Sequence, residues 1–532
     1  MNQLILLGDE ALALAALDGG LSCAYGYPGT PSTEIMEYLE KAQAGRGILA
    51  RWCSNEKTAY EAALGVSLAG RRTLVTMKHV GLNVAADPFI NSALLGIHGG
   101  LVLAVADDPG MHSSQDEQDS RFYADFAKIP CLEPRNHQEI YDMTRLAFQL
   151  SEQFKVPVMV RMVTRLAHSR AALIPREAEE QRRVSKAPDP RQWMLLPALA
   201  RQNLAALLES RREFSAFTAA YPGNDLRLTG AEWGVITTGL GGNYFEENLE
   251  ELSRLAGTPS WLHINAYPVP VEKIRLLAAS VKRLVIIEEG EPFVERYLRG
   301  LLEIPLSLAG KLTGEVPLIG ELNPDNIRPA LGLPNRRGLP PESGLPNRPP
   351  QLCQGCPHGD SYQALNQARQ GFPQSLVTSD IGCYALGASP PYSAIETIVC
   401  MGASIGMARG AAEAGFYPVA AVLGDSTFLH SGITALVDAV QAGADMTLLI
   451  LDNSTVAMTG WQETILPSEK LESLILGLGV DPAHFHKILP LKKNLEENTG
   501  IIRKEMEYHG LSVILSVREC IVAAKRRPKG KA

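Results

Sequence analysis

The chain has 532 residues, of which 45% are hydrophobic and 20% charged, and its formal net charge at pH 7 is −8. The length suggests several domains of ordinary globular composition, and the acidic balance excludes a general attraction to nucleic acid or anionic membranes. No stretch is apolar enough for a membrane span, and the first residues lack the basic segment of a signal peptide. We therefore expect a cytoplasmic protein whose eight cysteines are reduced or metal-bound.

The first predicted domain, residues 1–180, alternates apolar strand-like runs with amphipathic helical ones, which is typical of a parallel α/β sheet. We expect strands at Cys23–Tyr25, Thr73–Met77 and Leu101–Ala106. Each is followed by a loop rich in Gly, Asp or Pro. Because open α/β sheets bind ligands at such loops, we expect functional residues there.

A helical connector is predicted over residues 181–230, where a polar start leads into a long amphipathic stretch. A second α/β domain is predicted over residues 231–330, with strands at Trp233–Thr238 and Arg283–Glu288. The turn at residues 239–242 (GLGG) could seat a phosphate, but simple strand-to-helix geometry explains such a turn more often than not.

Residues 331–350 are rich in proline, which predicts an extended surface linker. We expect the last domain over residues 351–520. A basic, disordered tail is predicted over residues 521–532.

The strongest local signal lies in the last domain, where two apolar runs each end in polar residues. One run leads into Gly424, Asp425, Ser426 and Thr427, and the other into residues 453–455 (NST). These residue types and their spacing resemble the Gly-Asp…Asn motif of thiamine-diphosphate enzymes.

Such a motif would bind a diphosphate together with Mg²⁺, an ion that prefers oxygen ligands. The expected ligands are the carboxylate of Asp425, the amide oxygen of Asn453 and the backbone carbonyl of Thr455. Gly424 would let the backbone approach the phosphates, and the N–H groups of residues 426 and 427 would donate to them. The alternative is an acidic turn beside an ordinary strand end.

Longer motifs resemble the thiamine-diphosphate-binding subunit of indolepyruvate:ferredoxin oxidoreductase, within the 2-oxoacid:ferredoxin oxidoreductase superfamily. They are YPGTPSTE at Tyr27–Glu34, CSNEK at Cys53–Lys57, TMKHVGLNVAADP at Thr76–Pro88, VADDPGMHSSQDEQDSR at Val105–Arg121, CQGCPH at Cys353–His358, DIGCYALG at Asp380–Gly387 and MGASIGMARG from Met401. The resemblance implies a multidomain α/β thiamine-enzyme fold of parallel-sheet domains. These are a pyrimidine-binding-type domain over residues 1–180, a transketolase-C-like domain over residues 231–330 and a diphosphate-type domain over residues 351–520.

The sequence departs from this family in three places. The family usually continues into a ferredoxin-like domain with two cysteine-rich motifs, which we do not expect in this protein. Gly359 stands where an arginine is usual. WQETILPSEK, residues 461–470, stands where a His-Gln-Pro-His stretch is usual.

By resemblance, Glu56 is the acid that bonds the aminopyrimidine ring of the cofactor. A simpler role for Glu56 is to stabilise the N-terminus of a helix. Other residues are implied to face the 2-oxoacid, where a cation or hydroxyl would hold its carboxylate and a histidine would move protons. They are Thr30, Lys78, His79 and His112. His358 and His430 are weaker candidates near the diphosphate, because a lone histidine is more often structural.

Cys353 and Cys356 form the only Cys-x-x-Cys pair, which alone could be a redox pair, half of a zinc site or neither. The resemblance implies that they join Cys383 and Cys520 in holding one [4Fe–4S] cluster, which requires four thiolates. The remaining cysteines are expected to be core or strand residues: Cys23, Cys53, Cys131 and Cys400.

The resemblance thus implies oxidative decarboxylation of an arylpyruvate to aryl-acetyl-CoA, with electrons passed to ferredoxin or another iron–sulfur carrier. It also implies a smaller partner subunit and a hetero-oligomer with paired copies. One alternative is a non-oxidative thiamine-dependent decarboxylase or carboligase, which would need no cluster cysteines. Another is an inactive scaffold subunit, which would have no reason to keep Glu56, Asp425 and Asn453 together.

Overall fold

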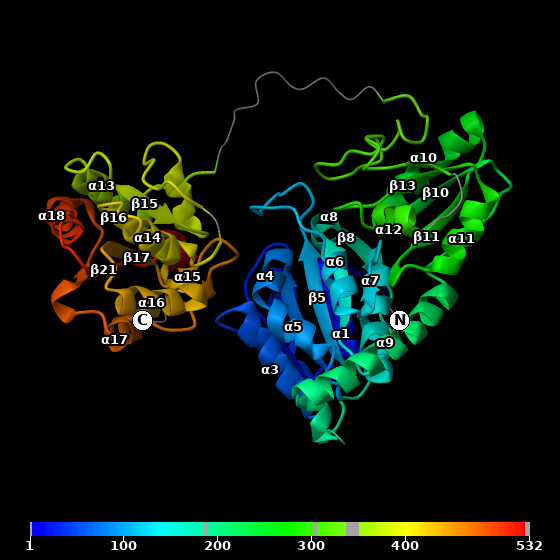
Figure 1. Ribbon diagram of the computed structural model, residues 1–532, viewed down its shortest axis with the longest axis horizontal. Coiled ribbons are helices and arrows are strands. Elements are labelled where there is room, and N and C mark those ends of the chain that lie inside the picture. Colours follow the sequence, from blue (N-terminus) through cyan, green and yellow to red (C-terminus); the bar gives the residue numbers. More distant parts are fainter. Residues whose placement is uncertain are drawn as a thin grey trace. The chain divides into compact units, whose positions relative to one another are not determined.

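The computed structural model describes residues 3–185, 187, 189–301, 306–336, 350–398 and 400–526 (Figure 1). The chain divides into two compact units, Met1–Pro340 and Pro341–Ala532, and each has its own hydrophobic core. Both are α/β, as the sequence predicts. Among the described residues, no helix has the length and apolarity needed to cross a membrane. Most of the predicted linker, residues 337–349, lies outside the described residues.

A seven-stranded sheet forms the base of the first unit. Its strands are β2 (Cys23–Gly26), β3 (Leu49–Trp52), β4 (Thr73–Lys78), β5 (Leu101–Asp107), β6 (Cys131–Leu132), β7 (Val158–Val163) and β12 (Ala266–Tyr267). Their order is β12-β6-β7-β5-β4-β2-β3, and all pairs are parallel except β12 with β6. β4 and β5 are buried along their whole length, which explains their continuous apolar sequences. Both extend one residue beyond the predicted ends, to Lys78 and Asp107.

The helices of this region connect and cover the strands. They are α1 (Gly8–Asp18), α2 (Thr33–Arg46), α3 (Glu56–Leu68), α4 (His79–Val84), α5 (Ala86–Ser92), α6 (Arg121–Ala127), α7 (His137–Phe154) and α8 (Thr164–His168). In α1 only Glu10 is not buried, so α1 is a core helix, packed against α2 and α7. A small antiparallel sheet pairs β1 (Leu4–Leu7) with β8 (Arg170–Leu173).

A five-stranded sheet completes the first unit. Its strands are β9 (Leu226–Arg227), β10 (Trp233–Thr238), β11 (Ser260–Ile264), β13 (Arg283–Ile287) and β14 (Ser307–Ala309), in the order β14-β13-β10-β11-β9. Its other elements are a 3₁₀ helix, η1 (Pro190–Trp193), and helices α9 (Pro197–Ala220), α10 (Gly241–Ala256), α11 (Val271–Ser280) and α12 (Phe293–Leu301). A Cβ on Gly241 would lie 2.6 Å from the carbonyl oxygen of Ile287, and one on Gly242 2.6 Å from the His263 ring. Close packing therefore explains these glycines.

The second unit contains a parallel five-stranded sheet of β15 (Leu376–Ser379), β16 (Val419–Gly424), β17 (Met446–Asp452), β20 (Phe485–Ile488) and β21 (Leu511–Val517), in the order β15-β16-β17-β21-β20. A hairpin pairs β18 (Thr455–Val456) with β19 (Gln462–Glu463). The helical segments are α13 (Pro357–Arg369), η2 (Cys383–Ala388), α14 (Ala403–Glu413), α15 (Asp425–Thr427), η3 (Phe428–Gly432), α16 (Ile433–Ala442), α17 (Ser468–Gly477), η4 (Pro482–His484), η5 (Lys492–Asn494), α18 (Leu495–Met506) and α19 (Ile521–Arg526).

Helix α19 corrects the expectation of a disordered tail from residue 521. Residues 521–526 are helical, and the guanidinium of Arg526 lies 3.5 Å from the centre of the Trp461 ring. This cation–π contact, which composition alone does not reveal, gives the basic segment a packing partner. Residues 527–532 lie outside the described residues.

Candidate functional site

In the second unit, the polar residues singled out from the sequence gather where neighbouring parallel strands end. Asp425 directly follows β16, and Asn453 directly follows β17. The two strands are paired in register, so their carboxyl ends lie side by side. The fold therefore brings these two residues to one edge of the sheet, where open α/β sheets bind ligands.

A buried pair of carboxylates forms the centre of this edge. Asp425 accepts hydrogen bonds from the backbone N–H of Ser426 (2.7 Å) and of Ser454 (2.9 Å), and Asp452 also accepts from Ser454 N (3.0 Å). Both side chains are at most 5% exposed. Burial, followed by the neighbouring Asp452 carboxylate, raises the pKa of Asp425 well above its usual range.

This pair fits a cation site. Oδ2 of Asp452 and Oγ of Ser426 are buried and lack a hydrogen-bond partner among the described residues. A buried carboxylate needs a counter-charge, and Mg²⁺ with oxygen ligands would supply one. The described oxygen ligands thus fit a Mg²⁺ ion.

The other predicted ligands lie at the same edge. Asn453 is 6% exposed, and its amide oxygen accepts a hydrogen bond from Thr455 N (3.1 Å). Its Nδ2 lies 3.1 Å from Nε2 of His358. Burial lowers the pKa of His358 to about 4, so the neutral ring accepts this hydrogen bond and orients the amide. His430 is buried too, and its Nδ1 lies 2.5 Å from the hydroxyl of Ser431.

Two observations differ from the expectation that Gly424, Ser426 and Thr427 serve only to bind phosphate. The N–H of Ser426 already donates to its neighbour Asp425, and the hydroxyl of Thr427 donates to the carbonyl of Ile381 (3.1 Å). A Cβ on Gly424 would lie 2.8 Å from the ring of Tyr384. Packing against that ring is thus a second reason for glycine at position 424.

The four predicted cluster cysteines line one cavity of about 100 Å³ in the second unit: Cys353, Cys356, Cys383 and Cys520. His358, Asn453 and Trp461 also line it. Burial raises the pKa of the Cys356 thiol to about 11 and that of Cys383 to about 12, with the neighbouring thiols adding to both shifts. No three of these described thiols lie within 4.8 Å of one another, whereas a tetrahedral zinc ion with bonds of about 2.3 Å would draw its sulfurs closer.

The other cysteines are mostly where the sequence predicts. Cys23 lies in β2 and Cys131 is buried in β6, while Cys53 follows β3 and is half-buried. The expectation of a core position is wrong for Cys400, which is exposed in the loop before α14.

In the first unit, a lysine and a threonine meet through one serine. Nζ of Lys78 donates to the carbonyl of Ser113 (2.6 Å), and the Ser113 hydroxyl donates to the carbonyl of Thr30 (3.2 Å). Lys78 is 7% exposed. Burial lowers the pKa of Lys78, and the carboxylates of Asp108 and Asp116 oppose that shift. These contacts place a buried cation beside the loop that follows β2.

His79 and Glu56 both lie near Lys78. His79 follows Lys78 as the first residue of α4, and Glu56 packs on the same helix. His79 is 1% exposed, and its Nε2 lies 3.3 Å from the carbonyl oxygen of Asp116, whereas Nδ1 has no hydrogen-bond partner among the described residues. Glu56 is the first residue of α3, because the side chain of Asn55 caps the helix by accepting from Thr58 N (2.9 Å). Its carboxylate packs on Gly81 of α4, where a Cβ would lie 2.5 Å from Oε1.

His112 is placed differently from these residues. It lies on the loop after β5 but is about half exposed, and its Nε2 lies 3.4 Å from the carboxylate of Glu321. The fold thus brings Thr30, Lys78 and His79 to one set of loops, whereas His112 contacts a residue outside them.

Asp452 is the residue that inspection of the sequence misses. It ends β17 next to Asn453, and its position at that strand end was the available signal. Its closeness to Asp425 becomes evident only when the register of β16 and β17 is known.

Two family models match the chain. Residues 14–222 match "Pyruvate flavodoxin/ferredoxin oxidoreductase, thiamine diP-bdg", and residues 380–489 match "Thiamine pyrophosphate enzyme, C-terminal TPP binding domain". The first range includes Glu56 and Lys78, and the second includes Asp425 and Asn453.

Curated relatives match along nearly the whole chain. The "Indolepyruvate oxidoreductase subunit IorA" of Archaeoglobus fulgidus is 36% identical over 564 residues, which cover 100% of this chain and 89% of that protein. The subunit of the same name from Methanothermobacter thermautotrophicus is 34% identical, over 98% of this chain and 88% of that protein.

One solved structure supports the fold. A 2-oxoglutarate:ferredoxin oxidoreductase from Magnetococcus marinus aligns with a TM-score of 0.52 at 17% identity, over 60% of this chain and 63% of that one. At this identity the likeness supports the α/β thiamine-enzyme architecture alone.

Proposed function

Because the chain belongs to the family of the indolepyruvate oxidoreductase subunits IorA, it is a thiamine-diphosphate-dependent oxidoreductase acting on 2-oxoacids, and we propose that its substrate is an arylpyruvate such as indolepyruvate. The proposed reaction converts the arylpyruvate anion and CoA to aryl-acetyl-CoA, CO₂, one proton and two electrons. The similarity to IorA subunits over nearly the whole chain carries this proposal.

The proposed diphosphate site lies at the ends of β16 and β17. Asp425, Asn453 and the backbone of Thr455 would bind Mg²⁺, and the unpartnered oxygen of Asp452 lies in the same loop region. Gly424, Ser426 and Thr427 would border the phosphates, with His358 orienting Asn453. Thiamine diphosphate, when bound, supplies a nucleophilic carbon and takes up the electron pair released on decarboxylation.

Glu56 is proposed to bond the ring nitrogen of the aminopyrimidine and hold a proton there. Its burial at 6% exposure supports this role, because a hydrogen bond to a carboxylate is stronger away from water. Glycine at position 81 leaves room for this carboxylate, because a Cβ there would lie 2.5 Å from Oε1 of Glu56.

Lys78, His79 and Thr30 are proposed to bind the 2-oxoacid. The ammonium of Lys78 donates to the carbonyl of Ser113 and, over 3.4 Å, to its hydroxyl, which leaves its third N–H for a substrate carboxylate. The unpartnered Nδ1 of His79 could exchange a proton with the substrate. His112 is half exposed beside Glu321, so its proposed contact with the substrate would be made from the solvent-facing side of these loops.

The four cysteines around the cavity of the second unit are proposed to hold one [4Fe–4S] cluster. We also propose that residues 1–180, 231–330 and 351–520 are the pyrimidine-binding-type, transketolase-C-like and diphosphate-type domains. The partners proposed from the family are a smaller subunit, with paired copies in a hetero-oligomer, and ferredoxin or another iron–sulfur acceptor.

Product analysis tests this proposal. The chain, purified anaerobically with its smaller partner, would be supplied with thiamine diphosphate, Mg²⁺, CoA and an artificial electron acceptor. We expect indolepyruvate or phenylpyruvate to yield aryl-acetyl-CoA in preference to products from pyruvate or 2-oxoglutarate. Release of the aryl aldehyde without acceptor reduction would instead identify a non-oxidative decarboxylase.

Glu56→Gln provides the matched inactive variant. Glutamine preserves size but cannot hold the protonated ring nitrogen, so turnover should fall at least about 100-fold while the cofactor still binds. Glu61→Gln, on the same helix with an exposed side chain paired to Lys57, should retain full turnover. Wild-type turnover in Glu56→Gln would remove this residue from the mechanism.

A further inference from the structure

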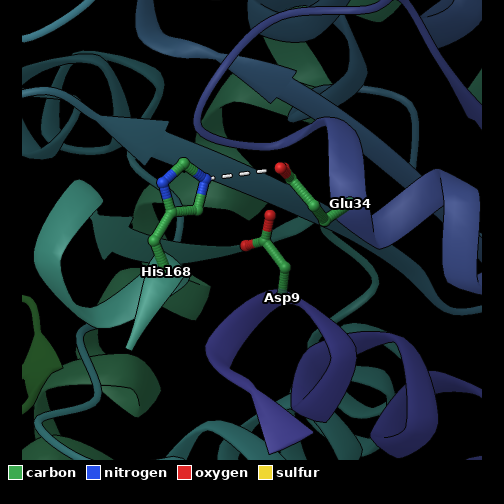
Figure 2. A group of neighbouring side chains, drawn as sticks. All are labelled: Asp9, Glu34 and His168. Atoms are coloured by element: carbon green, nitrogen blue, oxygen red, sulfur yellow. Dashed lines mark ion pairs between the residues drawn. The ribbon is translucent and has the colours of Figure 1, made fainter. Parts of the chain in front are cut away.

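Three helix ends meet in the first unit, away from the residues assigned above. Asp9 is the second residue of α1, Glu34 is the second residue of α2, and His168 is the last residue of α8. Figure 2 shows their side chains converging on one small space. One ligand atom from each lies within 4.8 Å of the other two, and Nε2 of His168 is 3.5 Å from Oε2 of Glu34.

Asp9 is the residue that this arrangement leaves unexplained. Its side chain is 0% exposed, and neither carboxylate oxygen has a hydrogen-bond partner among the described residues. In Figure 2 the carboxylate points into the space between Glu34 and His168. A buried carboxylate without a partner is costly, so this position calls for a proton or a cation.

Of the surrounding groups, His168 supplies a positive charge when protonated, since its hydrogen bond to Glu34 raises its pKa, but it pairs with Glu34 and not with Asp9. Burial, followed by the charge of Glu34, raises the pKa of Asp9 well above its usual range. Arg170, the nearby strand residue, pairs with Glu10 instead (3.5 Å). In the described part of the chain, the only ion pair of Glu34 is with His168, and Asp9 has none.

We propose that Asp9, Glu34 and His168 bind one divalent first-row transition-metal ion, at a site separate from the Mg²⁺ of the diphosphate. Two carboxylates suit Mn²⁺ and related ions, and the imidazole favours a transition metal over Mg²⁺ or Ca²⁺. The side chains of Glu34 and His168 are each 35% exposed, which gives the ion a path of entry and leaves room for water ligands.

The consequence of binding would be structural. The ion would link the N-termini of α1 and α2 to the C-terminus of α8 through its three ligands. Glu34 lies on the first turn of α2, just after the loop of residues 27–32 that carries Thr30, and Gly29 N of this loop donates to the hydroxyl of Thr33 (3.0 Å). An occupied site would therefore stabilise the first unit and hold one end of this loop.

Binding of Mn²⁺ to the full-length protein tests the site directly. The protein would be stripped with a chelator and dialysed against Mn²⁺ at pH 8, where protons compete least for the ligands. We expect each wild-type chain to bind one more Mn²⁺ ion than a chain with Asp9→Asn or His168→Gln. In these two variants the affinity of the site for Mn²⁺ should fall at least about 10-fold.

His509→Gln is the matched control. His509 forms a similar histidine–carboxylate pair with Asp445 at 3.4 Å, but it is exposed and has no third ligand. This variant should bind as much Mn²⁺ as wild type. Equal Mn²⁺ content in wild type, Asp9→Asn and His168→Gln would overturn the proposal and leave a proton shared by Asp9 and Glu34 as the explanation.

Thermal unfolding gives a second readout that does not depend on activity. Mn²⁺ should raise the unfolding midpoint of wild type by a few degrees through binding to the folded state, and should raise that of Asp9→Asn less. Without metal, Asp9→Asn should be at least as stable as wild type, because the substitution removes a repelling carboxylate. A metal-dependent increase of the same size in both proteins would also contradict the site.

Discussion

At the scale of single residues, the arrangement of Asp425 and Asp452 dominates the second unit. Two buried carboxylates lie at adjacent strand ends, and the shared N–H of Ser454 donates to both. Like charges in a buried place disfavour ionisation, so the ion-free arrangement is electrostatically unfavourable at neutral pH. A bound cation would reverse that relation, so the proposed binding of Mg²⁺ and cofactor would depend on both carboxylates.

Replacing Asp425 by asparagine should therefore abolish cofactor binding. Asparagine keeps the size and one acceptor but removes the charged Mg²⁺ ligand. The affinity for thiamine diphosphate, measured by calorimetric titration in the presence of Mg²⁺, should fall by at least the roughly 10–100-fold that loss of an outer-sphere partner costs.

Asp438→Asn is the control for this change, since Asp438 lies on α16 with a 70% exposed side chain paired to Arg409. Its affinity should equal that of wild type. Unchanged binding and unchanged Mg²⁺ dependence in Asp425→Asn would mean that the strand-end motif does not bind the cofactor.

Residue types at strand ends made part of this site predictable. Asp425 and Asn453 follow apolar runs whose strand-like length and flanking turn residues favour buried strands, and this places both residues at a sheet edge. The metal candidates Asp9 and His168 were not predictable, because they are far apart in the chain and each alone resembles an ordinary helix-end residue. The orientation of His112 toward Glu321 likewise depends on tertiary packing.

At the scale of elements, a buried ionic network joins the two sheets of the first unit. Arg161 on β7 donates to Asp107 (2.6 Å) and also pairs with Glu133. Arg121 on α6 bonds Glu288 after β13 (3.0 Å) and, through Tyr267, contacts β12 (3.3 Å). The network thus reaches from the centre of the seven-stranded sheet to the five-stranded one.

Arg161→Leu should destabilise the first unit strongly. The substitution removes the ion pairs of Arg161 with the buried carboxylates of Asp107 and Glu133, and breaking a buried pair in this way costs about 3–5 kcal/mol. Denaturant unfolding followed by tryptophan fluorescence would measure the loss, because four of the five tryptophans lie in this unit: Trp52, Trp193, Trp233 and Trp261.

Arg212→Leu tests whether burial is the reason. Arg212 pairs with Glu209 on α9, but both side chains are largely exposed, so the loss should be about 0–1 kcal/mol. Equal losses in the two variants would show that the network contributes no more than a surface pair.

Strands and helices were predicted correctly where the local sequence determines them, and were missed where they depend on contacts between distant segments. Strand β10 has the predicted bounds, and β4 and β5 differ by one residue, because long apolar runs bounded by turn residues have few other solutions. Strand β12 was not predicted: two residues from the middle of the chain pair with β6, and no local pattern encodes that crossing. Helix α19 was missed because its contact with Trp461 lies outside its own sequence.

At the scale of the whole molecule, the proposed roles divide between the two units. The proposed cofactor acid and substrate-binding residues belong to the first unit, whereas the diphosphate and cysteine residues belong to the second. Within the second unit, Cys520 N donates to the carbonyl of Asn453 (3.0 Å), so the cysteine cavity and the loop proposed to bind Mg²⁺ share a backbone contact.

The last prediction concerns iron. If the four cysteines hold one [4Fe–4S] cluster, the anaerobically purified complex should contain about four irons for each copy of this chain, in addition to any iron of its partner. Cys356→Ser should lose that iron and the CoA-dependent reduction of an artificial acceptor, yet still bind thiamine diphosphate through Asp425. Cys400→Ser, which changes an exposed thiol outside the cavity, should keep both. An active complex whose large subunit contains no iron would contradict the cluster, and electrons would then have to pass from the cofactor directly to the partner.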